Sequence, residues 1–232
     1  MCTNYAPSKR DVAESMMPLV SVSGEWPAEV FRDFQAPLIR RVPLTHAAVD
    51  ESPSDGRYEL LAGNYSLVPQ RFMSPARKFS TMNCRMEDVG QRRNYASAWR
   101  AGQLCLLPTA HYYEWLYQPG KKNPERWAIG VADGSDFCIA GLWRDWPDAS
   151  GETFTAFAQF TANADQHALL SQFHRPEDEK RAVVIMPREN YDDWLNCHDP
   201  EFARSMLQLL PADQLRAWPA PKKKSEGKAP SS

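Results

Sequence analysis

The sequence lacks the features of a membrane or exported protein. No apolar run approaches the roughly 18 residues that a membrane span needs. The N-terminus also has no basic segment followed by an apolar stretch, which is the pattern of a secretory signal. Residues 15–22 are largely apolar, but the segment is short and contains Pro18. We therefore expect a cytoplasmic protein with no membrane partner.

The chain also lacks paired cysteines and clustered histidines. Its five cysteines are an odd number without a Cys-x-x-Cys pair, and its five histidines are scattered. These patterns argue against a disulfide framework and against a zinc site. We expect no metal and no cofactor. In a reducing compartment, four of the cysteines should be buried apolar residues.

A strong excess of charge of either sign is missing as well. The chain has 27 basic and 29 acidic residues, and a net charge of −2 does not indicate a nucleic-acid-binding protein. Locally, however, the segment from position 71 to 100 contains seven basic residues and only two acidic ones, Glu87 and Asp88. Such a stripe can follow a phosphate backbone, and it can equally be a solvated surface. Its members are Arg71, Arg77, Lys78, Arg85, Arg92, Arg93 and Arg100.

What the chain does contain is enough apolar sequence for a core built around strands. Its 232 residues are 43% hydrophobic, which suits a single domain, and 19 prolines keep the helices short. Alternation and β-rich composition predict strands at 58–68, 104–107, 126–131, 137–143, 154–161 and 182–186. Helices are predicted at 9–18, 164–173, 187–196 and 200–210.

These elements show no regular alternation of strand and helix. We therefore predict an α+β fold in one domain, residues 2–218, with a bent, barrel-like, mostly antiparallel sheet flanked by short helices. Residues 219–232 are rich in Pro, Lys and Ser and predict a disordered basic tail. We expect the protein to be a monomer.

Cys2 is the most informative residue for function. Removal of Met1 would make Cys2 the N-terminus, with an amine and a thiol on adjacent carbons. Such an aminothiol can condense with an aldehyde to a Schiff base and then close a thiazolidine ring. An unperturbed α-amine has a pKa of about 7.7–8.0 and a thiol about 8.5, so both groups are partly reactive near neutrality. In an arbitrary chain, a second-position cysteine would be an unremarkable terminal residue.

Several further segments, taken with Cys2, resemble one known family. They are Thr81-Met82-Asn83-Cys84-Arg85-Met86-Glu87, Leu104-Cys105-Leu106-Leu107-Pro108 followed by Tyr112-Tyr113-Glu114-Trp115, Ala140-Gly141-Leu142-Trp143, and Phe160-Thr161-Ala162-Asn163-Ala164 followed by His174-Arg175-Pro176. Their order and spacing over about residues 1–200 are similar to those of the SRAP family, the SOS response-associated peptidases or abasic site processing proteins.

This resemblance implies the SRAP fold and a function in the response to DNA damage. The implied partner is single-stranded DNA containing abasic sites, which Cys2 would capture as a covalent thiazolidine crosslink, with an accompanying lyase activity. Glu114 would activate the Cys2 amine, and it lies among aromatics where partial desolvation favours a proton-transfer role. His174 would protonate the sugar ring oxygen, and Asn83 would donate its amide to a developing oxyanion or to the cysteine backbone.

The resemblance also implies DNA contacts and supporting residues. Arg85 and Arg93 would clamp phosphates, and Trp115, Tyr65 and Pro37 would stack on exposed bases. Glu87 would hold Arg85 in place, and Thr161 would support the site.

The chain departs from the family pattern at several positions. Thr3 and Asn4 replace a glycine and an arginine, and Tyr65-Ser66 replaces a tryptophan and a glycine. The acidic run Glu177-Asp178-Glu179 is inserted after His174. Two other functions stay open at this point. One is an N-terminal-cysteine peptidase, acting on other proteins or on itself, and the other is a non-catalytic module that binds single-stranded DNA.

Overall fold

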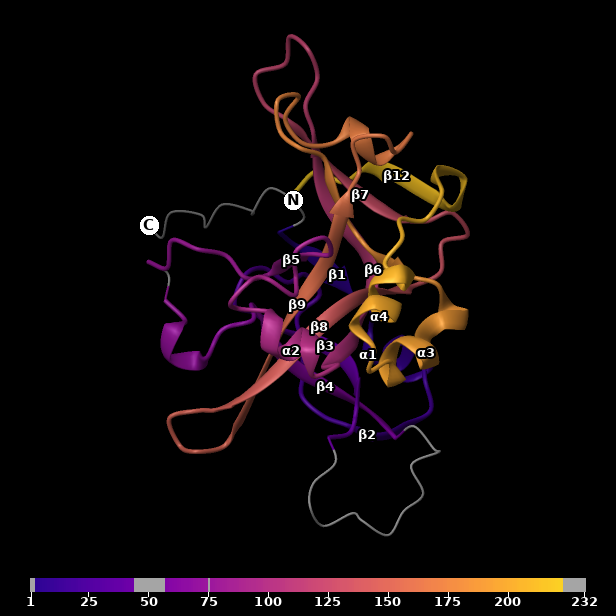
Figure 1. Ribbon diagram of the computed structural model, residues 1–232. Coiled ribbons are helices and arrows are strands. Elements are labelled where there is room, and N and C mark those ends of the chain that lie inside the picture. Colours follow the sequence, from indigo (N-terminus) through magenta and orange to yellow (C-terminus); the bar gives the residue numbers. More distant parts are fainter. Residues whose placement is uncertain (1–2, 44–56, 75, 223–232) are drawn as a thin grey trace, which may run out of the picture.

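The computed structural model describes residues 3–43, 57–74 and 76–222. Within these ranges the chain forms a twelve-stranded sheet with short helices at its sides, as Figure 1 shows. The strands are β1 (Tyr5–Pro7), β2 (Leu19–Val22), β3 (Gln35–Arg41), β4 (Tyr58–Tyr65), β5 (Asn83–Arg85), β6 (Leu104–Leu116), β7 (Glu125–Val131), β8 (Phe137–Pro147), β9 (Thr153–Asn163), β10 (Arg181–Val183), β11 (Ile185–Met186) and β12 (Leu215–Pro219). The α-helices are α1 (Arg10–Glu14), α2 (Ala96–Arg100), α3 (Tyr191–Asn196) and α4 (Pro200–Met206).

Five of the strands close into a barrel. The path β8–β9–β4–β3–β6 returns to its start because β6 also pairs with β8, from Leu104–Leu142 to Thr109–Phe137. In this ring only the β4–β9 pairing is parallel. The prediction of a single α+β domain with a barrel-like, mostly antiparallel sheet is therefore confirmed. Closure removes the free edges of these five strands, and edges are otherwise sites of unwanted strand pairing.

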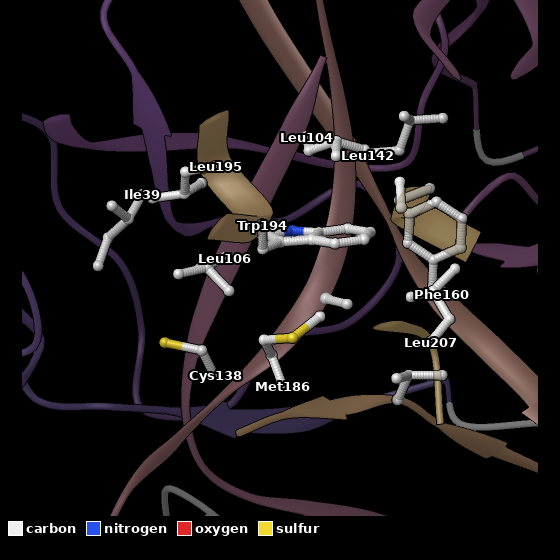
Figure 2. Packing of buried hydrophobic residues seen from close by; sticks show 14 of the residues in the cluster. Ile39, Leu104, Leu106, Cys138, Leu142, Phe160, Met186, Trp194, Leu195 and Leu207 are labelled. Atoms are coloured by element: carbon white, nitrogen blue, oxygen red, sulfur yellow. The ribbon is translucent and has the colours of Figure 1, made fainter. Parts of the chain in front are cut away.

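Two apolar clusters cover the two faces of this sheet. In Figure 2, Trp194 of α3 lies among Leu104, Leu106, Leu142 and Phe160, so this cluster fills the space between the sheet and the helices. The indole N–H of Trp194 donates to the carbonyl of Cys105 at 2.9 Å, which satisfies the buried polar atom of an otherwise apolar side chain.

The second cluster fills the barrel with the alternate residues of the same strands. It includes Leu38, Cys105, Leu107, Ile139 and Phe157. Packing is tight here: a Cβ on Gly141 would lie 2.7 Å from the Cys105 sulfur, so only glycine fits at that position. The site residues discussed below border this interior cluster.

The structure corrects several predicted elements. Residues 164–173 contain no α-helix, only a 3-10 turn at Leu170–Gln172, and α1 is much shorter than 9–18. The strand predicted at 104–107 continues to Leu116. Pro219 ends β12 and the Ala220 N–H donates to the Arg126 carbonyl, so the chain stays ordered two residues into the predicted tail. Residues 223–232 lie outside the described part.

No helix within the described ranges is both long and apolar enough to cross a membrane.

Candidate functional site

Glu114 lies on the buried face of β6 because the strand that carries it contains an irregularity. β1 pairs with β6 antiparallel, but Ala6 faces His111 while the next residue, Pro7, faces Thr109. The extra residue of β6, Ala110, forms a bulge, and a bulge reverses which side of the strand later residues face. Cys105 and Leu107 face inward before it, and Tyr112 and Glu114 do so after it. Glu114 is consequently 3% exposed.

His174 reaches the same place from a distant loop. It has a φ of 69°, in the left-handed region that non-glycine residues adopt at some cost. Its backbone N–H donates to the carbonyl of Trp115 at 2.9 Å, so the loop is attached to β6 directly beside Glu114. The preceding residue, Phe173, is buried and packs against the ring of Trp127. Trp127 lies on β7 directly opposite Glu114 of β6. The unusual backbone is thus held from both sides.

The loop that follows His174 is fastened by one lysine. The ammonium group of Lys180 donates to the carbonyls of Arg175, Pro176 and Asp178, the last at 2.7 Å. The Lys180 N–H donates to a carboxylate oxygen of Asp165 at 2.8 Å. These contacts close residues 174–180 into a compact turn, which limits the movement of the imidazole.

Glu114 and His174 form a buried pair. The Nε2 atom of His174 lies 3.1 Å from Oε2 of Glu114, and the side chains are 9% and 4% exposed. The angles of this contact are not those of a hydrogen bond, and within the described part of the chain Oε1 of Glu114 and Nδ1 of His174 also have no hydrogen-bond partner. Buried polar atoms are nearly always paired, so atoms left unpaired point to a reaction partner. The pair can exchange a proton with a bound molecule.

The N-terminal strand leads to this pair. The Tyr113 N–H donates to the Asn4 carbonyl at 3.2 Å, and Tyr5 pairs with Tyr112. Continuing this antiparallel register by one residue brings Thr3 opposite Glu114. Cys2 lies outside the described residues, so its predicted role is not tested here.

Asn83 occupies the start of β5, which pairs in parallel with β9. Its side-chain oxygen accepts a hydrogen bond of 2.7 Å from the Gln159 amide, and its carbonyl accepts one of 3.0 Å from the Tyr95 hydroxyl. Gln159 is fully buried on the same side of β9 as Phe157. Asn83 therefore also borders the barrel interior, with its amide orientation fixed.

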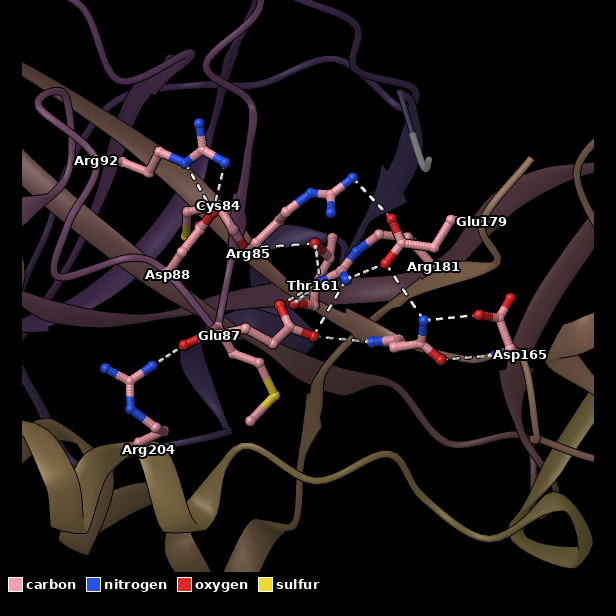
Figure 3. A network of polar contacts seen from close by, with 12 residues as sticks. Cys84, Arg85, Glu87, Asp88, Arg92, Thr161, Asp165, Glu179, Arg181 and Arg204 are labelled. Atoms are coloured by element: carbon pink, nitrogen blue, oxygen red, sulfur yellow. Dashed lines mark hydrogen bonds and ion pairs between the residues drawn. The ribbon is translucent and has the colours of Figure 1, made fainter.

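The charged residues in and just after β5 pair differently from the prediction. Figure 3 shows that Glu87 does not hold Arg85: its carboxylate accepts two bonds from Arg181, at 2.8 and 3.1 Å. Arg85 instead contacts Glu179 at 2.8 Å. Arg181 is nearly buried and also donates to Glu179 and to the Thr161 carbonyl, so Thr161 supports this network. The Arg181 contacts lower the pKa of Glu87, although burial opposes the change.

Two of the predicted base-stacking residues are wrong. Tyr65 is fully buried, with its ring 5.3 Å from that of Tyr5 and 5.5 Å from that of Phe157. Pro37 is buried within β3. Both belong to the core and present no surface to a base. Trp115 remains accessible, at 37% exposure, beside the Glu114–His174 pair.

Arg93 lines a surface groove that the sequence did not predict. The groove has a volume of about 440 Å³, and Arg144 and Trp146 contribute to it. Phe72 and Phe79, which also line it, are 50% and 51% exposed. The exposed phenylalanines and the arginines combine apolar rings with positive charge. Phe72 and Phe79 within the basic stripe were the available signal, but single phenylalanines in a loop do not reveal their exposure.

Solved structures share this architecture. A Bordetella bronchiseptica protein is 30% identical, with a TM-score of 0.79 over 94% of this chain and 99% of that one. A Bacteroides thetaiotaomicron protein, 18% identical, gives a TM-score of 0.69 over 94% and 91%. A phage-related protein from B. bronchiseptica, 16% identical, gives 0.65 over 95% of each chain. The two less similar structures support the fold alone. No functionally curated protein matches the chain significantly.

The match to a family profile extends over almost the whole sequence. It covers residues 1–225, and the family is described as SOS response associated peptidase, or SRAP. This description associates its members with the response to DNA damage. The profile match and the shared architecture agree, and the chain belongs to the SRAP family.

Proposed function

We propose that this protein captures abasic sites in single-stranded DNA through a covalent bond to Cys2. The observation that carries the proposal is the buried Glu114–His174 pair, whose unpaired atoms lie where the N-terminal strand ends. The β1–β6 register, continued from Tyr5–Tyr112, brings Thr3 opposite Glu114, and Cys2 is joined to Thr3 by a single peptide bond. In this proposal the Cys2 amine and thiol react beside the Glu114–His174 pair.

The reaction balances without an outside reagent. The Cys2 amine attacks the aldehyde carbon of the opened sugar, and loss of one water gives a Schiff base. The thiol sulfur then bonds to the same carbon, the C=N electron pair moves to nitrogen, and nitrogen takes the proton that the thiol gives up. His174 protonates the ring oxygen to open the sugar, and Glu114 accepts the proton that the attacking amine loses. Each such role typically contributes about 10²–10⁴-fold.

The charged and aromatic surface supports a single-stranded DNA partner. Arg93, Phe72 and Phe79 line one groove, and stacking of a base on an aromatic side chain contributes about 1–3 kcal/mol. Arg85, which is 42% exposed, adds a positive charge on β5. Phe72, Phe79 and Trp146 take the place that the sequence gave to Tyr65 and Pro37.

The test is intact-protein mass spectrometry after mixing with a single-stranded oligonucleotide that contains one abasic site. We expect a denaturation-stable adduct equal to protein plus DNA minus one water. Cys2→Ala should abolish it, and Cys2→Ser should leave only a Schiff base that borohydride traps, because the amine remains.

A protein whose N-terminus is blocked should form no adduct, and full crosslinking by such a protein would falsify the mechanism. The family description also includes peptidase activity. If cleavage of a peptide, and no DNA adduct, depended on Cys2, the peptidase function would replace the one proposed. Reversible DNA binding alone, without adduct or cleavage, would indicate a non-catalytic binding module.

A further inference from the structure

We propose that Glu29, Asn4 and Arg126 are positioning residues that fix the N-terminal segment for reaction; this inference rests on the proposed function. Nothing in the motifs pointed to Glu29 or Arg126, which are 97 residues apart. The carboxylate oxygen Oε1 of Glu29 accepts hydrogen bonds from both the Asn4 amide and the Arg126 guanidinium. One carboxylate thus joins the N-terminal strand to β7.

The contact is built into the structure and is not a chance surface pair. Asn4 is 5% exposed, and the Arg126 side chain is 6% exposed. The Arg126 guanidinium lies 3.3 Å from the centroid of the Tyr113 ring, a close cation–π contact. Tyr113 in turn donates its N–H to the Asn4 carbonyl. The side chain and the backbone of Asn4 are therefore held by residues that are themselves fixed.

The segment that carries Glu29 is attached to the same strand. Val30 and Tyr5 exchange two backbone hydrogen bonds, with Val30 donating at 2.9 Å and Tyr5 at 3.3 Å. Residues 4 and 5 consequently lie between β6 on one side and residues 29–30 on the other. A terminal segment is normally among the most mobile parts of a domain unless it is tied down in this way.

Alternation along the strand sets which face of β6 the clamp occupies. Asn4 and Tyr113 share the face that carries Glu29 and Arg126, whereas the next pair, Thr3 and Glu114, belongs to the opposite face, toward the His174 side of β6. The clamp thereby holds Asn4 on the face of β6 opposite Glu114.

Loss of the clamp should lower the rate of adduct formation and leave DNA affinity unchanged. Cys2 is two residues from Asn4, so a looser Asn4 would let the aminothiol sample many orientations. A displacement of about 1 Å can cost about 100-fold in a positioned reaction. The arginines and aromatics that would contact DNA lie elsewhere, at Arg85 and along the Arg93 groove.

The experiment measures single-turnover adduct formation at saturating protein, together with the dissociation constant for an oligonucleotide carrying a tetrahydrofuran analogue that cannot react. We expect Asn4→Ala and Glu29→Ala each to slow adduct formation about 10- to 100-fold and to change affinity less than 2-fold. Because both variants break the same Asn4–Glu29 contact, the double variant should be no slower than the slower single variant.

Glu59→Ala is the matched control, because Glu59 also pairs with a nearly buried arginine, Arg40, at 2.8 Å and remote from the N-terminus. It should leave the rate at the wild-type value. Glu29→Ala leaves Arg126 unpaired and risks unfolding, but Asn4→Ala keeps the Arg126–Glu29 pair and tests the contact in a folded protein.

The result that would overturn this inference is a wild-type adduct rate in Asn4→Ala, or equal slowing in Asn4→Ala and Glu59→Ala. Either leaves the proposed function intact. Absence of any adduct with the wild-type protein would instead remove the proposed function, and with it the reaction that the clamp serves.

Discussion

Glu179 is predicted to restrain DNA binding by occupying Arg85. Its carboxylate lies 2.8 Å from the guanidinium, and the two side chains are 35% and 42% exposed. The other carboxylate oxygen is 2.9 Å from Arg181, which keeps Glu179 in position, as Figure 3 shows. The hydrogen bond from Arg181 lowers the pKa of Glu179, so the carboxylate is ionised at neutral pH. A phosphate must displace this carboxylate before Arg85 can bind it.

The size of the effect follows from the exposure of the pair. Exposed ion pairs contribute about 0.2–1 kcal/mol. Their loss on binding corresponds to a factor of about 1.4–5 in affinity. Glu179→Gln should therefore tighten binding to undamaged single-stranded DNA by about 1.4- to 5-fold. The fold should tolerate the change, because Arg181 keeps both bonds to Glu87 and glutamine still offers it an acceptor oxygen.

Fluorescence anisotropy with a labelled oligonucleotide, measured over a salt series, provides the assay. Glu177→Gln is the control, since it removes the same charge from the same insertion. Each phosphate neutralised contributes about −0.7 to the log–log salt slope, so Arg85→Ala should make the slope about 0.7 shallower. In the Arg85→Ala protein, Glu179→Gln should act no more strongly than Glu177→Gln.

Equal effects of Glu179→Gln and Glu177→Gln on the otherwise unchanged protein would refute the reasoning. They would mean that only the net charge of the insertion matters. Weaker binding by Glu179→Gln would show that the carboxylate orders Arg85 for DNA and does not compete with it.

Two other predictions concern catalysis and pH. Glu114→Gln should slow adduct formation by about 10²-fold or more and leave DNA affinity nearly unchanged. His174→Ala should slow both formation and reversal of the adduct, because a catalyst accelerates both directions of one step. Single-turnover kinetics with a trap for released DNA measures both rates, and unchanged rates in His174→Ala would make this histidine structural. The bonds to Arg181 lower the pKa values of Glu87 and Glu179. These carboxylates therefore stabilise the fold at pH above their ordinary pKa near 4.5, and this stabilisation is lost as the pH falls through their lowered pKa values. Thermal unfolding between pH 3 and pH 7 should accordingly show a smaller loss of stability on the acid side for Arg181→Met than for the wild type, and parallel curves would count against the network.

The sequence predicted the strands where local alternation was strong, and missed them where one residue masked the pattern. Pro108 ended the predicted strand at Leu107, because proline is rare inside sheets. In the structure β6 continues through it and pairs Pro108 with Cys138. The bulge at Ala110 then reverses the alternation, so the inward positions no longer follow one period of two. No local pattern marks such a shift.

The predicted helix at 164–173 failed because polar side chains there bind the backbone. The Asp165 N–H donates to the Asn163 side chain at 3.0 Å, and the Asp165 carboxylate accepts from the Lys180 N–H. These bonds offer the backbone an alternative to a helix. The apolar residues of the segment, such as Leu170, are still buried as predicted for a packed face.

Site residues could be named from motifs in the sequence, but their contacts with residues far apart in sequence could not. Glu114 and His174 were named from a resemblance over most of the chain, and the structure places them in contact. The partner of Arg85, and the burial of Tyr65 and Pro37, depend on residues far away in sequence. Arg181 and Glu87 are 94 positions apart, so no window of sequence could pair them. The same limit hid Glu29 and Arg126.

Three irregular features of the backbone act together on one carboxylate. The bulge at Ala110 turns Glu114 to the buried face of β6, the left-handed backbone of His174 brings an imidazole to it, and the short strand β1 pairs with the neighbouring part of β6. A regular five-stranded barrel needs none of these features, and a non-glycine residue in the left-handed region costs of order 1–3 kcal/mol. The closed barrel supplies the stability that offsets this cost. The bulge and the left-handed residue bring two titratable side chains within 3.1 Å of each other, which the packing of the barrel does not require.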